Sequence, residues 1–271
     1  MNILIRNLGL AFLIAIGGRV ALAADAAPAG HVMLLTGHGS ALSADGGAIR
    51  ELHKDDAVFT GEMISAAGNS YVNLRFTDDS FILLRPNTRM LVESYAYPPA
   101  AEAPKPAATA PAPTPAASAS KPAATANGGG STATRYRGFF RLLKGGFRAV
   151  SGLIGKVDRE EYRVSTPVAT IGIRGTDYYV YQCDAACEND PVIAELIGDG
   201  KLPPNIAGGT LVGVYKGAVL VQSLTGKSTL VEAGQYLLTL ADGSQYLLPI
   251  EPLFLRVTPF PDPTTFCAVD G

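Results

Sequence analysis

Short runs in which apolar and polar residues alternate recur along most of this chain. At 71–76, for example, every second residue is Val, Leu or Phe, so a strand there would bury one face and expose the other. Runs of this kind predict strands at 31–35, 57–60, 63–66, 71–76, 81–84, 90–93, 177–182, 211–215, 218–223, 228–232, 235–240 and 244–248. Strands that recur about every 8–12 residues between turn residues are typical of an all-β sandwich, barrel or solenoid.

Three other stretches need separate arguments. Apolar residues between 135 and 156 would fit one side of a helix, but Gly145 and Gly146 interrupt them, which favours a strand, a glycine turn and a second strand. A short helix is predicted at 191–197, because a proline suits a first helical turn and a glycine follows as a stop. The glycines at 37–39 predict a turn.

Composition changes sharply between 98 and 134, where nearly every residue is Ala, Pro, Thr, Ser or Gly. A segment without large apolar side chains cannot offset the entropy that it loses on ordering, so we predict a disordered Pro/Ala-rich insertion. A bare spacer is the favoured interpretation of its composition. The alternatives are a tether through the cell wall and a docking segment for a partner.

The first 24 residues predict a signal peptide. Arg6 supplies the positive charge, residues 8–16 form a short apolar run, and 21–23 fit a small-residue cleavage site. The apolar run is too short to cross a bilayer comfortably, and no later segment reaches about 18 apolar residues. We therefore expect a periplasmic, secreted or cell-surface protein with no transmembrane span after cleavage. An uncleaved anchor is the alternative.

Charge gives a local signal rather than a global one. The 271 residues carry a formal net charge of -2, so nothing in the overall balance indicates a nucleic-acid partner. Residues 135–174, in contrast, include nine Lys or Arg and three acids. A solvated face is the simpler interpretation of this basic stretch. The alternative is a surface that binds a polyanion, an anionic lipid headgroup or an acidic partner.

Three cysteines, Cys183, Cys187 and Cys267, remain after the predicted cleavage. An oxidising compartment makes a disulfide expected. Cys183 and Cys187 are near enough in sequence to close a small loop, and Cys267 could instead join the C-terminal tail to this region, with one thiol left over in either case. The three histidines lie far from the cysteines and show no ligand spacing, so no metal and no cofactor are predicted.

The stretch from 162 to 181 is the least ordinary part of the chain. It is rich in Val, Ile and Tyr, and Gly172 and Gly175 flank Ile173 and Arg174. Two β segments joined by a Gly-Arg-Gly corner are predicted, since glycines allow a bulge or a close backbone approach. Arg174 is expected to form a buried structural pair with Asp177 or Glu161. Binding of an anion or of a partner carboxylate is the alternative.

This stretch resembles the signature of the FecR domain, which occurs in the periplasmic part of iron-transport regulators and in exported envelope proteins. The resemblance depends on Thr166, Pro167, Ala169, Ile173, Arg174, Gly175, Thr176 and Tyr178. A weaker similarity extends over 30–97 and to about residue 240, on both sides of the insertion, which places the insertion within one domain. The resemblance implies an all-β, solenoid-like or sandwich-like unit that binds or relays and performs no chemistry.

These observations divide the chain into six parts. They are a signal peptide (1–24), a first β part (30–97), the insertion (98–134), a second β part with the signature (135–187), a C-terminal β region (188–250) and an extended tail (251–271).

No convincing catalytic constellation is found in the sequence. The Gly-Lys-Ser at 226–228, for instance, lacks the earlier glycine of a phosphate-binding loop, so we predict that the protein is not an enzyme. We expect an exported module that binds an envelope protein or an anionic ligand in envelope signalling or scaffolding. The alternatives are a cell-wall-associated structural protein and an enzyme acting on polysaccharide or peptidoglycan, which would need two carboxylates facing a cleft.

Overall fold

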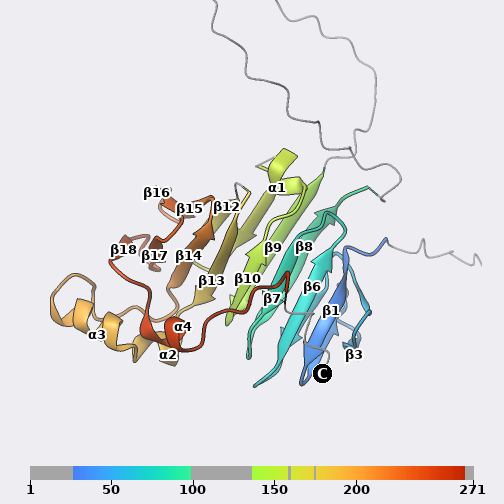
Figure 1. The fold of residues 1–271 in the computed structure, drawn as a ribbon, viewed down its shortest axis with the longest axis horizontal. Coiled ribbons are helices and arrows are strands. Elements are labelled where there is room, and N and C mark those ends of the chain that lie inside the picture. The colour runs from blue at the N-terminus through green and yellow to red at the C-terminus, as the bar shows by residue number, and fades with distance from the viewer. Residues whose placement is uncertain (1–26, 99–135, 158–159, 174, 266–271) are drawn as a thin grey trace, which may run out of the picture.

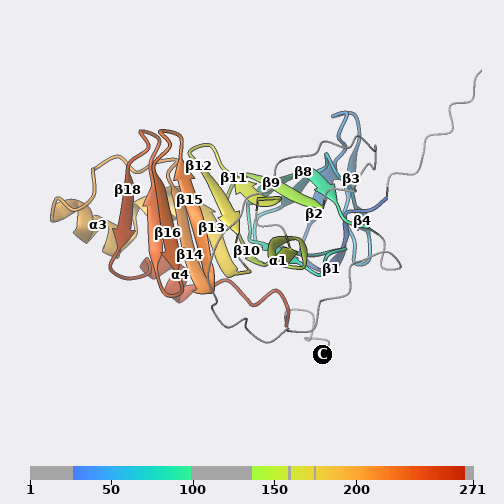
Figure 2. The same cartoon turned by 90° about the horizontal axis from the view of Figure 1, so that it is seen from above.

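The strands of this protein form two sheets that lie one above the other (Figures 1 and 2). The structure is a computed structural model and describes residues 27–98, 136–157, 160–173 and 175–265. Each sheet has nine strands. The predicted all-β fold of short strands, solenoid-like or sandwich-like, is confirmed.

The first sheet, called sheet A here, has a spatial order that begins near the C-terminus. Its strands are β18 (Gln245–Leu248), β17 (Tyr236–Thr239), β14 (Thr210–Lys216), β13 (Asp177–Gln182), β10 (Gly146–Val150), β7 (Phe81–Leu84), β6 (Tyr71–Phe76), β1 (Gly30–Thr36) and β4 (Ala57–Val58).

The spatial order of the second sheet, called sheet B, also begins near the C-terminus. Its strands are β16 (Ser228–Glu232), β15 (Ala218–Ser223), β12 (Ala169–Ile173), β11 (Tyr162–Ser165), β9 (Arg137–Lys144), β8 (Arg89–Ala96), β5 (Met63–Ala66), β2 (Gly39–Leu42) and β3 (Ile49–Glu51).

The chain crosses repeatedly from one sheet to the other while it advances along the stack. Two strands at most are added to one sheet before the chain moves to the other, and both sheets therefore grow nearly in sequence order. Among the described strands, neighbours pair antiparallel except β9 and β11, which are parallel. This progression gives the sandwich its solenoid-like character.

The main core lies between the two sheets and is rich in aromatic rings. Phe76 of sheet A and Phe140 of sheet B meet edge to face with centroids 5.0 Å apart, and Tyr162 lies 5.6 Å beyond Phe140. All three side chains are almost completely buried. Burying each contributes about 1.5–3 kcal/mol relative to exposure, so this contact between the layers is a main source of stability.

A second apolar layer covers the outer face of sheet A over β13, β14, β17 and β18. It contains the short helices α2 (Ala185–Glu188), α3 (Pro191–Gly198) and α4 (Leu253–Val257) and the segment that follows α4 (Figure 1). Asp190 connects these parts, because its Oδ1 accepts from the N–H of Val192 at the start of α3 and its Oδ2 accepts from the N–H of Phe254 in α4. A further short helix, α1 (Ile154–Val157), follows β10.

Most predicted elements agree with this structure, and several do not. The strand, glycine turn and strand predicted within 135–156 are confirmed as β9, Gly145 and β10, and the predicted helix is α3. The turn predicted at 37–39 is wrong at its last residue, because Gly39 begins β2. The strand β3 was not predicted. The tail predicted to be extended contains α4. The predicted signal peptide, and the insertion beyond Pro98, lie outside the described residues.

Candidate functional site

The outer faces of the two sheets differ in what covers them. Strands of sheet A such as β13 and β14 are buried on both sides over most of their length, because the second apolar layer packs on them. Strands of sheet B such as β2 and β12 alternate between buried and partly exposed residues. The outer face of sheet B is therefore the broad surface of the sandwich that the described residues leave open to solvent.

The signature segment joins the two sheets. β12 belongs to sheet B and β13 to sheet A, so the chain changes sheets between residues 173 and 177. Gly175 lies in this corner with φ +69°, a backbone conformation that favours glycine. Gly172 lies inside β12 rather than at the corner. The predicted Gly-Arg-Gly corner is therefore shorter than expected and does not include Gly172. Arg174 lies outside the described residues.

The hydroxyl groups of the signature act on local backbone. Thr166 Oγ1 accepts from the N–H of Ala169 at 3.0 Å, which holds the turn that contains Pro167. Thr176 donates its N–H to Ser151 Oγ at 2.8 Å and its hydroxyl to the carbonyl of Ala218 at 2.7 Å. These bonds fix the two ends of the segment.

The apolar members of the signature face the core. Ala169, Ile173 and Tyr178 belong to the buried cluster between the sheets. Burial raises the pKa of Tyr178 well above its usual value, and so does the neighbouring Tyr162, so its phenol stays neutral. The described signature residues therefore build the fold and do not form a surface site.

Asp177, which was expected as a possible partner of Arg174, binds Arg148 of β10. Arg148 donates from Nε to Asp177 Oδ1 at 2.8 Å and from Nη2 to Oδ2 at 2.7 Å. The same guanidinium donates to the carbonyl of Phe260 at 3.1 Å and lies 4.4 Å from the ring centre of Tyr215. Burial alone would lower the pKa of Arg148, but Asp177 outweighs it and the pKa is raised. This cluster holds the C-terminal segment on sheet A.

The basic stretch predicted at 135–174 does not form one patch. Arg148 lies on sheet A beneath the C-terminal segment, whereas Arg141, Lys144 and Arg163 lie on sheet B. Arg141 pairs with Glu93 on the neighbouring strand β8. Of the other described cations of this stretch, Lys144 and Arg163 lie on sheet B, and Lys156 lies exposed on α1.

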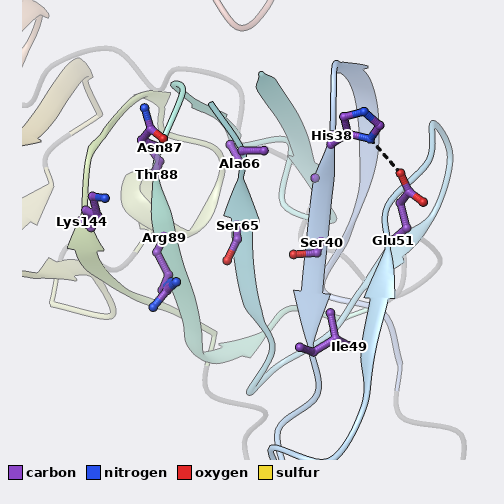
Figure 3. Close-up of a pocket in the computed structure, with 12 residues that line it drawn as sticks. His38, Ser40, Ile49, Glu51, Ser65, Ala66, Asn87, Thr88, Arg89 and Lys144 are labelled. Atoms are coloured by element: carbon purple, nitrogen blue, oxygen red, sulfur yellow. Dashed lines mark hydrogen bonds and ion pairs between the residues drawn. The ribbon is translucent and has the colours of Figure 1, made fainter. Parts of the chain in front are cut away.

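A row of polar side chains crosses five strands on the outer face of sheet B (Figure 3). Neighbours in this polar row face one another in register: Glu51 of β3, Ser40 of β2, Ser65 of β5, Arg89 of β8 and Lys144 of β9. The row lines a hollow of about 450 Å³ that Asn87 and His38 also border. His38 Nδ1 lies 3.1 Å from Glu51 Oε1, so the acid at one end of the row already has a partner.

A second, smaller hollow lies further along the same face. It measures about 310 Å³ and is bordered by Arg163, Thr170 and Leu220. Gly172 leaves it open, because a Cβ there would meet only the carbonyl of Leu220, at 3.8 Å. Arg163 lies over the ring of Phe139, with its guanidinium carbon 3.8 Å from the ring centre. A cation held on a partly exposed ring is a common element of binding surfaces.

The structure forms one of the disulfides that the sequence allowed. Cys183 is bonded to Cys187, and the two Cα atoms are 5.2 Å apart. The bond joins the end of β13 to α2, within the second apolar layer. Cys267 lies outside the described residues.

The described part of the chain offers no evident centre for metal chemistry. Within these ranges, no group of three or more His, Cys, Asp or Glu side chains is arranged to hold a metal ion. None of the helices in the same ranges has the length and apolar character needed to cross a bilayer.

Comparisons with known proteins give little further information. No family model matches the chain, and no curated protein matches it. Two crystal structures of a candidate anti-sigma factor from Parabacteroides distasonis ATCC 8503 are matched, each with a TM-score of 0.40 and 13% sequence identity. Each match covers 72% of this chain and 62% of that protein. A likeness this distant carries no argument about function.

Sequence reasoning did not single out the polar row. Its five members come from five strands. Ser40, Ser65 and Arg89 are ordinary polar residues on the exposed side of an alternating pattern, whereas the alternation along β9 would place Lys144 on the same side as the buried Leu142. The excess of Lys and Arg at 135–174 was a partial signal, since Lys144 belongs to it. Arg89 carried no signal of its own.

Proposed function

We propose that the chain is an exported, non-catalytic binding module of the kind found in FecR domains, acting in envelope signalling or scaffolding. Its partner would be an envelope protein or an anionic ligand that docks on the outer face of sheet B. The resemblance at 166–178, the predicted signal peptide and the all-β fold are the basis for this proposal.

The observation that carries the proposal is the contrast between the two outer faces. Three short helices and an extended segment cover the C-terminal strands of sheet A, and the described residues place no such layer on sheet B. The open face combines the Phe139–Arg163 stack with the cations of the polar row. Aromatic rings and arginines are enriched among the residues that dominate protein interfaces.

The test is affinity capture from solubilised envelopes of the native host, with the purified mature protein as bait. Arg163→Glu reverses the charge at the centre of the open face, and we expect recovery of a defined partner to fall at least tenfold. Arg75→Glu is the matched control, because Arg75 is also a half-exposed cation near an aromatic ring, Phe81, but lies on sheet A. Equal loss in both variants would contradict the assigned face.

The same experiment separates the alternative functions. Retention by bulk peptidoglycan, unchanged in Arg163→Glu, would indicate a wall-associated structural protein. Release of soluble glycan from the envelope fraction by the purified protein would indicate an enzyme. Recovery of one stoichiometric partner that depends on Arg163 supports the binding module.

A further inference from the structure

The hollow over the polar row has an uncompensated positive end. Arg89 and Lys144 are register partners on the neighbouring strands β8 and β9. No carboxylate of the described ranges pairs with either, because Glu51 is engaged by His38 and Glu93 by Arg141. Like charges directly opposite one another in a sheet are destabilising, and an anion between them would remove that cost.

A β-bulge creates this juxtaposition. Met90 faces Leu142, so a regular ladder would place Leu143 opposite Arg89, but the register shifts and Lys144 takes that position. Bulges redirect side chains and are common beside functional sites. The shift replaces an apolar neighbour of Arg89 with a second cation.

The backbone that carries the two cations is firmly held. Thr88 Oγ1 donates to the carbonyl of Gly146 at 2.9 Å and accepts from its N–H at 3.0 Å. Gly145 has φ +75°, and a Cβ there would lie 2.7 Å from the Cα of Thr88. This tight contact fixes the end of β9 against the start of β8, so the backbone positions from which the two cations extend are set before any ligand arrives.

The rest of the hollow is lined by polar groups, by apolar residues such as Ile49 and Ala66, and by the acid Glu51, which pairs with His38 at the end away from Lys144. Ser65 and Ser40 continue the row from Arg89, and Asn87 lies at the rim beside Lys144 (Figure 3). Strands are about 4.8 Å apart, so the two hydroxyls lie roughly 5 and 10 Å from the Arg89 position. Hydroxyls and an amide at those positions suit a ligand that carries hydroxyl groups next to its anionic group.

We propose that this hollow binds a small anionic saccharide, with a carboxylate or phosphate held between Arg89 and Lys144 and sugar hydroxyls on Ser65, Ser40 and Asn87. An arginine fork recognises either anion with two parallel hydrogen bonds, and lysine adds a point charge. A volume of about 450 Å³ suits a ligand of one or two sugar rings. The inference rests on the proposed function only in taking the outer face of sheet B as the binding face.

The test is isothermal titration of the purified mature protein with four probes: glucuronate, glucose 6-phosphate, glucose and inorganic phosphate. We expect glucuronate or glucose 6-phosphate to bind at least tenfold more tightly than glucose, and the comparison of the two distinguishes a carboxylate from a phosphate. If inorganic phosphate binds as tightly as glucuronate and glucose 6-phosphate do, the proposal that the ligand is a saccharide is wrong. No heat from any acidic probe at 10 mM would overturn the site.

Variants of Arg89 and Lys144 test whether binding of the acidic probe depends on these two cations. Arg89→Gln and Lys144→Gln should each weaken the acidic probe at least tenfold while the melting temperature stays the same or rises, since repulsion is relieved. Arg75→Gln, an exposed cation on sheet A, should leave binding unchanged; an equal loss there would overturn the assignment. If the proposed function is right and the saccharide site is wrong, the double variant Arg89→Gln/Lys144→Gln should still capture the envelope partner. Arg163→Glu tests the proposed function separately.

Discussion

Replacing Arg148 with methionine should destabilise the protein more than replacing any exposed cation. The Arg148 side chain is 12% exposed and that of its partner Asp177 is 17% exposed, and two hydrogen bonds join them. Methionine keeps most of the side-chain length but leaves the carboxylate without its partner. Removing one member of a buried pair costs about 3–5 kcal/mol. Because both side chains retain some exposure, we expect the lower end of that range.

The loss should be visible in thermal and urea unfolding. For a protein of this size, 1 kcal/mol shifts Tm by about 2–4 °C, so about 3 kcal/mol corresponds to roughly 6–12 °C. The double variant Arg148→Met with Asp177→Asn should cost clearly less than the sum of the single variants, because the second change removes the stranded charge. Arg141→Met is the control: its pair with Glu93 is exposed and should contribute within about 1 kcal/mol.

Two results would refute this reasoning. A Tm change of less than about 2 °C for Arg148→Met would mean that the pair contributes no more than a surface pair. Additive single and double variants would mean that the two side chains do not interact. In either case the C-terminal segment would be held by its aromatic contacts and not by the Arg148 cluster.

Two further predictions concern the second apolar layer. Burial raises the pKa of Glu251, so the folded state binds the proton of this carboxyl more tightly than the unfolded state does. The protonated carboxyl contributes stability below the unfolded pKa, and this contribution is lost as the pH rises through the folded pKa. Glu251→Gln should therefore raise Tm at pH 7 and leave Tm unchanged at pH 3 in parallel thermal melts. The opposite pH order would contradict this. Replacing Cys183 and Cys187 with serine should cost about 2 kcal/mol, since the bond closes a loop of only a few residues; a wild-type Tm that does not respond to reductant would show that the bond does not form.

Much of the fold could be predicted because strand patterns are local. The strands at 63–66, 71–76 and 177–182 were predicted with the bounds that β5, β6 and β13 have. β2 was missed because its first residue is a glycine among turn-like glycines. Gly39 is nevertheless required in that strand, since a Cβ there would lie 2.9 Å from the side chains of Leu35 and Val72. That contact depends on the packing of two sheets and leaves no mark in the local sequence.

The candidate site was much less predictable than the fold. The polar row depends on the register of five strands, and one bulge decides that Lys144 and not Leu143 faces Arg89. A shift of one residue in any of these pairs would turn a member of the row toward the core. The stretch at 162–181 stands out in the sequence because its glycines and threonines serve a local corner. For the same reason it indicated the fold and did not locate a surface for binding.

The segment 251–265 has a consequence for how the protein matures. The segment runs across sheet A after α4 (Figure 1). Phe260 stacks on Tyr179 of β13 with centroids 5.1 Å apart, and the carbonyl of Pro263 accepts from Asn73 of β6 at 2.8 Å. These contacts join the C-terminal segment to strands that come much earlier in the chain, so every ladder of hydrogen bonds can form while this part of sheet A is still uncovered. Until the segment 251–265 packs on sheet A, the ring of Tyr179 lacks its stacking partner Phe260, so the last step of folding removes this aromatic surface from solvent.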